Sequence, residues 1–105
     1  MEKKKYNIQY STSFNKGLVE AMDYLSNILN NPNAAGKLIK ELEEKVKILT
    51  VFPRIFSLQI HNDDLVYKFK IQNYLVFYYI QEDTITICNI FYSKRNLSDL
   101  LNSIK

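Results

Sequence analysis

Two lysines stand two positions apart inside an otherwise almost continuously apolar stretch, LVYKFKIQNYLVFYYI at residues 65–80. Because side chains alternate along a strand, Lys68 and Lys70 would share one face, with roughly 7 Å between them at the backbone. Two neighbouring ammonium groups repel each other, which favours the neutral form of one of them and makes a general base conceivable. The pair would also hold a phosphodiester. A solvated outer face is the alternative, and the pair alone leaves both interpretations open.

Further basic and aromatic residues follow the last apolar stretch. Lys94 and Arg95 come just after it, where neighbouring strands would bring them beside the two lysines. Tyr92 offers a ring on which a nucleic-acid base could stack, as does the Tyr78/Tyr79 pair. The alternative for most of the eight tyrosines is ordinary packing on a half-buried strand.

Other chemistries lack the residues that they need. His61 is the one histidine and stands in an expected turn, so the sequence predicts no transition-metal site. Gly17 and Gly36 are the only glycines, too few for a loop that cradles phosphates. Cys88 lies in a strong strand pattern and is expected to be a small buried hydrophobic residue. Any catalysis is therefore expected to run without metal, cofactor or histidine.

The totals indicate one small globular domain over residues 1–105. Apolar residues make up 47% of the chain, which is enough for a core. A single cysteine excludes an intramolecular disulfide and fits a reducing compartment. We find no signal peptide and no apolar run long enough to span a bilayer, so we expect a cytoplasmic protein without membrane contact. The net charge of +3 is modest and does not by itself indicate nucleic-acid binding.

The first third of the chain predicts a strand and a helix. YNIQYS at residues 6–11 alternates as a short strand does. Residues 14–29 carry apolar side chains at helical spacing, and Thr12 or Ser13 would cap the N-terminus of this helix.

A second helix follows after a short break. Asn31 is expected to cap it, with Pro32 at the first helical position, where the missing N–H costs nothing. The helix should end at Phe52-Pro53 because a proline disfavours the helical conformation of the residue before it. So short a link predicts an αα-hairpin.

The second half of the chain predicts strands and a last helix. Four stretches are rich in β-branched and aromatic residues and are joined by short turns, which indicates antiparallel neighbours. A final helix is expected from Ser93 or Asn96 onward. The fold class is α+β, in the order β-α-α-β-β-β(-β)-α: a twisted antiparallel sheet with the helical hairpin on one face. The four strands are expected at 55–60, 65–71, 74–81 and 84–92.

The order and spacing of these elements resemble the RelE/ParE superfamily of bacterial type II toxin–antitoxin toxins. The resemblance covers nearly the whole chain. It implies a small basic toxin that is held inactive by a cognate antitoxin encoded beside it. The segments that carry it are YNIQYS, AMDYLSNILNNPNAAGKLIKELEEKVKILTVFP, YKFKIQNYLVFYYI and ITICNIFYSKRN.

Members of the superfamily differ in activity. RelE-like members enter the ribosomal A site and cut mRNA without a metal, whereas ParE-like members poison DNA gyrase. YKFK resembles the RelE strand with two active-site lysines, which implies that Lys68 is a base or phosphate ligand and Lys70 a transition-state stabiliser. Arg95 in SKRN resembles the catalytic arginine before the last helix and would clamp the phosphate.

The sequence also departs from the RelE pattern at two positions. Leu75 stands where RelE has an arginine, and Leu101 aligns with a tyrosine of the RelE C-terminal helix. Tyr92 would then supply the stacking ring, and Lys94 or Arg54 the missing charge in RNA binding.

Three functions remain open at this point. The first is a ribosome-dependent mRNA endoribonuclease, with the ribosome and mRNA as partners. The alternative is a DNA gyrase inhibitor without nuclease activity, and the third is a non-toxic binding module. All three predict an antitoxin that is acidic or amphipathic where it meets the cationic groove.

Overall fold

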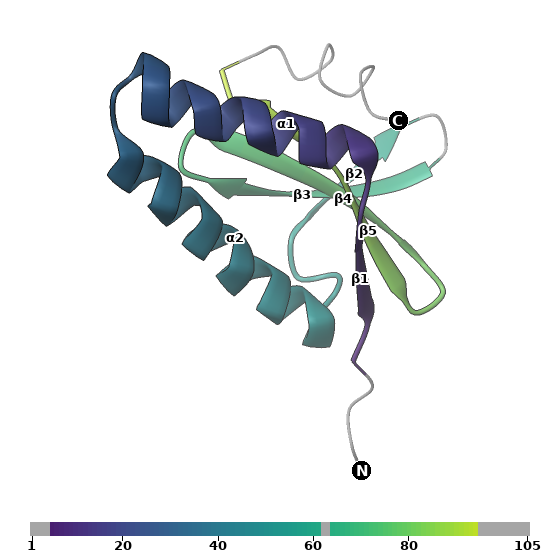
Figure 1. Cartoon of the computed structure of the whole chain (residues 1–105). Helices are drawn as coiled ribbons and strands as arrows, with labels where there is room; N and C mark the ends of the chain where they lie inside the picture. The colour runs from purple at the N-terminus through teal and green to yellow at the C-terminus, as the bar shows by residue number, and fades with distance from the viewer. Residues whose placement is uncertain (1–4, 62–63, 95–105) are drawn as a thin grey trace.

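The part of the chain that the structure describes folds into a five-stranded sheet and a pair of helices (Figure 1). The computed structural model of the chain describes residues 5–61 and 64–94, and the predicted C-terminal helix lies outside these residues. The strand order is β1-β5-β4-β3-β2, with β1 parallel to β5 and every other pair antiparallel. The elements are β1 (Asn7–Tyr10), α1 (Thr12–Asp23), a π-helical turn η1 (Tyr24–Ile28), α2 (Pro32–Val51), β2 (Ser57–His61), β3 (Asp64–Ile71), β4 (Tyr74–Gln81) and β5 (Thr84–Tyr92).

Ser11 caps α1, in place of the predicted Thr12 or Ser13. Its backbone is extended, as an N-cap requires, and its Oγ accepts a hydrogen bond from the Phe14 amide at 3.0 Å. The same hydroxyl donates to the Cys88 carbonyl on β5 at 2.8 Å. Thr12 and Ser13 already belong to the helix. A single hydroxyl therefore both starts α1 and fastens its beginning to the sheet.

The helical hairpin follows the prediction except at its bend. Asn31 caps α2 by accepting from the Ala34 amide at 3.1 Å, and Pro32 is the first helical residue. The helix ends at Val51, before Phe52-Pro53. The end of the first helix differs, because it widens into the π-helical turn η1 instead of continuing as α-helix. Such turns are rare and frequently occur at functional sites.

The main core lies between the sheet and the two helices, which cover one of its faces (Figure 1). Tyr78 is fully buried there, and its hydroxyl donates to the Pro53 carbonyl at 2.8 Å. Its burial raises the Tyr78 pKa and leaves no ring face for a nucleic-acid base.

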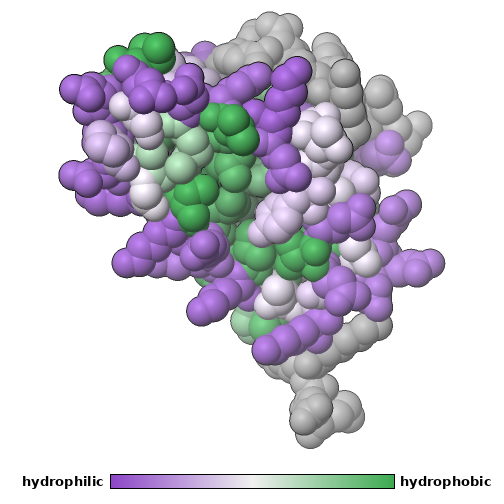
Figure 2. Space-filling view, viewed as in Figure 1, coloured by the Kyte–Doolittle hydropathy of each residue, from purple (hydrophilic) through white to green (hydrophobic). Residues whose placement is uncertain are grey.

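Seen from the same side as in Figure 1, apolar residues gather between the helices with hydrophilic residues around them (Figure 2). The largest fully buried core side chains besides Tyr78 are Phe14, Leu38, Leu49, Ile71, Ile85, Ile87 and Val76.

A second, smaller apolar cluster occupies the other face of the sheet. It consists of Val66, Phe77 and Cys88, all buried, with half-buried neighbours beside them. Cys88 is buried, as predicted, and the S–H of its free thiol donates to the Phe77 carbonyl at 3.4 Å. The strand bounds agree with the prediction to within two residues. Along residues 5–61 and 64–94, neither helix combines the length and apolar composition needed to cross a bilayer.

Candidate functional site

Lys68 and Lys70 lie on the sheet face that the helices do not cover. Tyr67 and Phe69, which alternate with them on β3, are buried in the main core. The prediction that the two lysines share a face is therefore confirmed. Lys68 is half-buried and lies across from Ser57 on β2, while Lys70 is exposed at the end of β3 nearer the β3–β4 turn.

Hydrocarbon side chains lie directly across from both lysines on the neighbouring strand. Phe77 of β4 pairs with Lys68, and Leu75 of β4 pairs with Lys70. The ring of Phe77 meets that of Phe91 edge-on, with 5.9 Å between centroids. A clamp for a phosphate needs cations or hydrogen-bond donors that converge on its oxygens. At these two strand positions the lysines meet apolar groups instead.

A β-bulge places Tyr92 on the opposite face from the lysines. Phe77 pairs with Asn89 and Tyr78 with Ile87, so Cys88 is an extra residue in β5. One extra residue exchanges the faces of every side chain that follows it. Tyr92 consequently packs against Tyr74 on the helix side, with 5.9 Å between ring centroids and 73° between ring planes.

Arg54 also lies away from the lysines. A hydrogen bond to Tyr6 is the main cause that raises the pKa of the Arg54 guanidinium group, and Tyr67 contributes to the same shift. Because Tyr67 belongs to the core on the helix side, Arg54 lies toward that side of the sheet. Lys94 is exposed just past β5, while Arg95 and Leu101 lie outside the described residues. The structure thus brings Lys68 and Lys70 together and separates Tyr92 and Arg54 from them.

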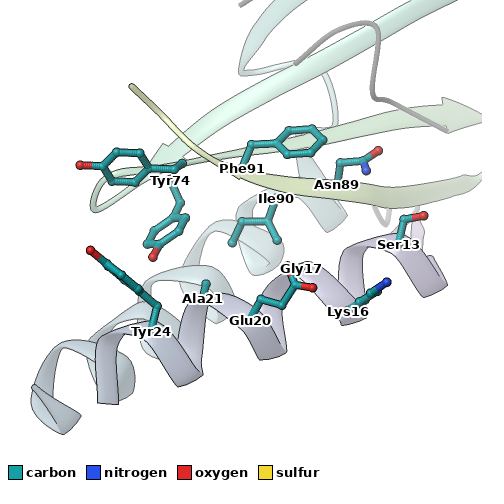
Figure 3. A pocket seen from close by; sticks show the side chains of 11 residues that line it. Ser13, Lys16, Gly17, Glu20, Ala21, Tyr24, Tyr74, Asn89, Ile90 and Phe91 are labelled. Carbon is teal, nitrogen blue, oxygen red and sulfur yellow. The ribbon is translucent and has the colours of Figure 1, made fainter. Parts of the chain in front are cut away.

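A groove that the sequence did not indicate opens between α1 and the end of β5 (Figure 3). Its volume is about 670 Å³, and it is lined by α1 residues from Ser13 to Ala21, by Tyr24 and Tyr74, and by Asn89 to Tyr92. Gly17 and Ala21 are the small residues of its α1 wall. A Cβ added at Gly17 would lie 2.9 Å from Ile90 Cγ2, so α1 approaches β5 more closely than a side chain at this position would permit.

Three tyrosines give this groove its chemistry. Tyr24 and Tyr92 are 45% and 40% exposed, whereas Tyr74 is buried. Burial raises the pKa of Tyr74, and the nearby hydroxyls of Tyr24 and Tyr92 raise it further. Tyr74 therefore keeps its proton at neutral pH, and the three side chains together present aromatic surface and hydrogen-bonding hydroxyls. Such groups are enriched in the energetically dominant parts of protein interfaces.

Charged side chains stand beside these rings. Lys16 and Glu20 lie one helical turn apart on the α1 wall of the groove (Figure 3). The groove is suited to binding a partner because it is concave and carries exposed aromatic rings and charges of both signs. Tyr24 comes from η1, Tyr74 from β4 and Tyr92 from the strand end after the bulge, so only the assembled fold brings them together.

Comparison with known proteins agrees with this fold. The family model of the ParE toxin of the type II toxin–antitoxin system parDE matches residues 8–97. A solved chain of the chromosomal ParDE toxin–antitoxin system from P. aeruginosa is similar, with a TM-score of 0.69 and 16% identity over 86% of this chain and 98% of that chain. At 16% sequence identity, this structural similarity supports the fold alone. No curated protein sequence matches. Because the family model spans most of the sequence and its RelE/ParE fold is the one observed, the chain belongs to the ParE toxin family of type II toxin–antitoxin systems.

Proposed function

We propose that this toxin arrests growth by inhibiting DNA gyrase, and that a cognate antitoxin encoded beside it holds it inactive. The observation that carries the proposal is the match of the ParE family model over residues 8–97. ParE-like members of the superfamily are the ones that act on gyrase, whereas the RelE-like members cut mRNA. The match therefore supports the gyrase alternative better than the endoribonuclease.

The lysine face supports the same choice. Leu75 occupies the position across from Lys70 where the RelE pattern has an arginine. Tyr92 and Arg54, which would have to replace the missing stacking ring and charge, lie toward the helix side of the sheet. A leucine can neither bind a phosphate nor transfer a proton.

The groove is the described surface best suited to a protein target. It combines two exposed tyrosine rings with Lys16 and Glu20 in one hollow. Inhibition of gyrase by binding needs such a recognition surface and no catalytic group. We therefore assign the contact with gyrase to the rings of Tyr24 and Tyr92.

One observation favours the nuclease as a second candidate, namely that Lys68 and Lys70 share a face as the RelE pattern requires. The two functions leave different traces in cells. After brief expression without antitoxin, gyrase inhibition should relax plasmid DNA and leave mRNA 5′ ends unchanged. New 5′ ends inside translated reading frames, lost in Lys70→Ala, together with unchanged plasmid supercoiling, would overturn the proposal.

A further inference from the structure

We propose that three tyrosines of the groove and a neighbouring carboxylate bind an arginine side chain of gyrase. We call this site the tyrosine cage; it consists of Tyr24, Tyr74, Tyr92 and Glu20. The inference rests on the proposed inhibition of gyrase. It adds the chemical group that the groove recognises in its target.

The rings of the tyrosine cage form a corner that is open to solvent. The ring planes of Tyr74 and Tyr92 lie 73° apart, with 5.9 Å between the ring centroids. Tyr24 lies on the helical wall of the groove, opposite Tyr74 (Figure 3). Its hydroxyl is near enough to contribute to the raised pKa of Tyr74. Because Tyr24 and Tyr92 are 45% and 40% exposed, a ligand can reach the rings from solvent.

The tyrosine cage is the electronegative end of the groove. The face of an aromatic ring carries partial negative charge. The Tyr24 amide donates to the Glu20 carbonyl, so the two side chains lie one helical turn apart on the same face of the helix. Lys16 lies two turns from Tyr24, roughly 12 Å along the helix axis. The rings and the exposed carboxylate of Glu20 therefore favour a cation at this end.

An arginine suits these groups better than a lysine does. Its planar guanidinium group stacks on aromatic rings and is more weakly hydrated than an ammonium group. Its five N–H donors match the carboxylate and phenol oxygens, which are the acceptors of the cage. The groove volume of about 670 Å³ leaves room for the side chain and for the segment that carries it. Gyrase offers such residues, because protein surfaces that bind DNA neutralise its phosphates with arginine and lysine.

A small arginine probe tests the site without gyrase. Acetyl-arginine amide carries the guanidinium group, and acetyl-citrulline amide has nearly the same shape without the charge. In two-dimensional proton–carbon NMR spectra, the ring signals of Tyr24 and Tyr92 should shift about fivefold more with the arginine probe at equal concentration. Glu20→Gln should reduce these shifts about threefold. Glu44→Gln, at an exposed position of α2 outside the groove, is the matched control and should leave them unchanged.

Two results of this experiment would overturn the cation site. One is an equal shift with both probes, which would mean that the cage does not distinguish a cation from its neutral counterpart. The other is a shift that Glu20→Gln leaves unchanged. Neither result depends on whether the toxin inhibits gyrase.

The gyrase assay then tests whether the arginine belongs to gyrase. Tyr24→Phe keeps the ring and should inhibit supercoiling within about threefold of the parent toxin, whereas Tyr24→Leu should inhibit about fivefold less well. Glu20→Lys places a cation in the cage itself and should lower inhibition about tenfold. Undiminished inhibition by Tyr24→Leu or by Glu20→Lys would overturn the inference and leave gyrase inhibition standing. No inhibition by the parent toxin would instead overturn the proposed function and the assignment of the arginine to gyrase.

Discussion

Lys70 on β3 lies directly across from Leu75 on β4, on the face of the sheet that the helices leave open. A cation that faces hydrocarbon gains no partner for holding a phosphate, and Lys68 faces Phe77 in the same way. The two lysines have the spacing of the RelE strand that they resemble, but the neighbouring strand carries Leu75 where the RelE pattern has an arginine. This arrangement supports the proposal that this ParE-family toxin acts by binding and not by RNA cleavage.

The tyrosine groove gives the first prediction. Tyr24→Ala and Tyr92→Ala should each reduce inhibition of gyrase supercoiling about tenfold, which corresponds to roughly 1.4 kcal/mol of binding free energy. Both side chains are substantially exposed, so the melting temperature should change little. Tyr10→Ala is the matched control, since Tyr10 is 42% exposed and lies outside the groove. Equal losses in all three variants would argue against a role specific to the groove.

The contact between α1 and β5 gives a prediction on stability. Gly17→Ala should lower the free energy of unfolding by about 1–3 kcal/mol, because its Cβ would lie 2.9 Å from Ile90 Cγ2 and 3.2 Å from the Ile90 carbonyl oxygen. Gly36→Ala on α2 meets no atom within 4 Å and should instead raise it by about 0.5–1 kcal/mol through helix propensity. Urea unfolding of both variants measures this. A gain in Gly17→Ala as large as that in Gly36→Ala would show that the two elements can separate freely.

Cys88 gives a prediction on pH. Burial raises the pKa of its thiol from the ordinary 9.0 to about 11. A folded-state pKa above the unfolded one means that the native thiol keeps its proton longer, so its contribution to stability is complete below pH 9 and is lost as the pH rises toward 11. The loss should amount to about 2–3 kcal/mol.

The measurement is the free energy of unfolding between pH 8 and pH 11, for the parent and for Cys88→Ala. Tyr10, Tyr74 and Tyr78 also have raised pKa values and contribute to the alkaline loss in both proteins. The variant should therefore show a shallower decline, whatever its stability at pH 8. Parallel curves would mean that the Cys88 thiol titrates alike in the folded and unfolded chain.

The sequence predicted most of the elements because their signals are local. Each of these patterns is contained in the residues of the element that it predicts. Examples are the alternation along β3, the helical spacing of apolar residues and the break at Asn31-Pro32. The pairing of β1 with β5 was not predicted, since strand partners distant in sequence leave no local pattern. The cap at Ser11 likewise depends on its second hydrogen bond, to Cys88.

The site was less predictable because it depends on contacts between residues that are distant in sequence. Simple alternation along β5 puts Tyr92 on the face opposite Ile87, which is the lysine face, and the bulge at Cys88 reverses this. The groove needs that reversal together with the π-helical turn at Tyr24. The sequence predicted Tyr92 as an RNA-binding ring beside the lysines, whereas the structure places it in the lining of the groove.

Gyrase inhibition is tested most directly by measuring supercoiling by purified gyrase as the toxin is titrated. We expect the parent toxin and the double variant Lys68→Ala/Lys70→Ala to inhibit supercoiling at concentrations within about threefold of each other, because neither lysine lies in the groove. Undiminished supercoiling at a large excess of parent toxin would contradict gyrase inhibition and would favour a function of the lysine face.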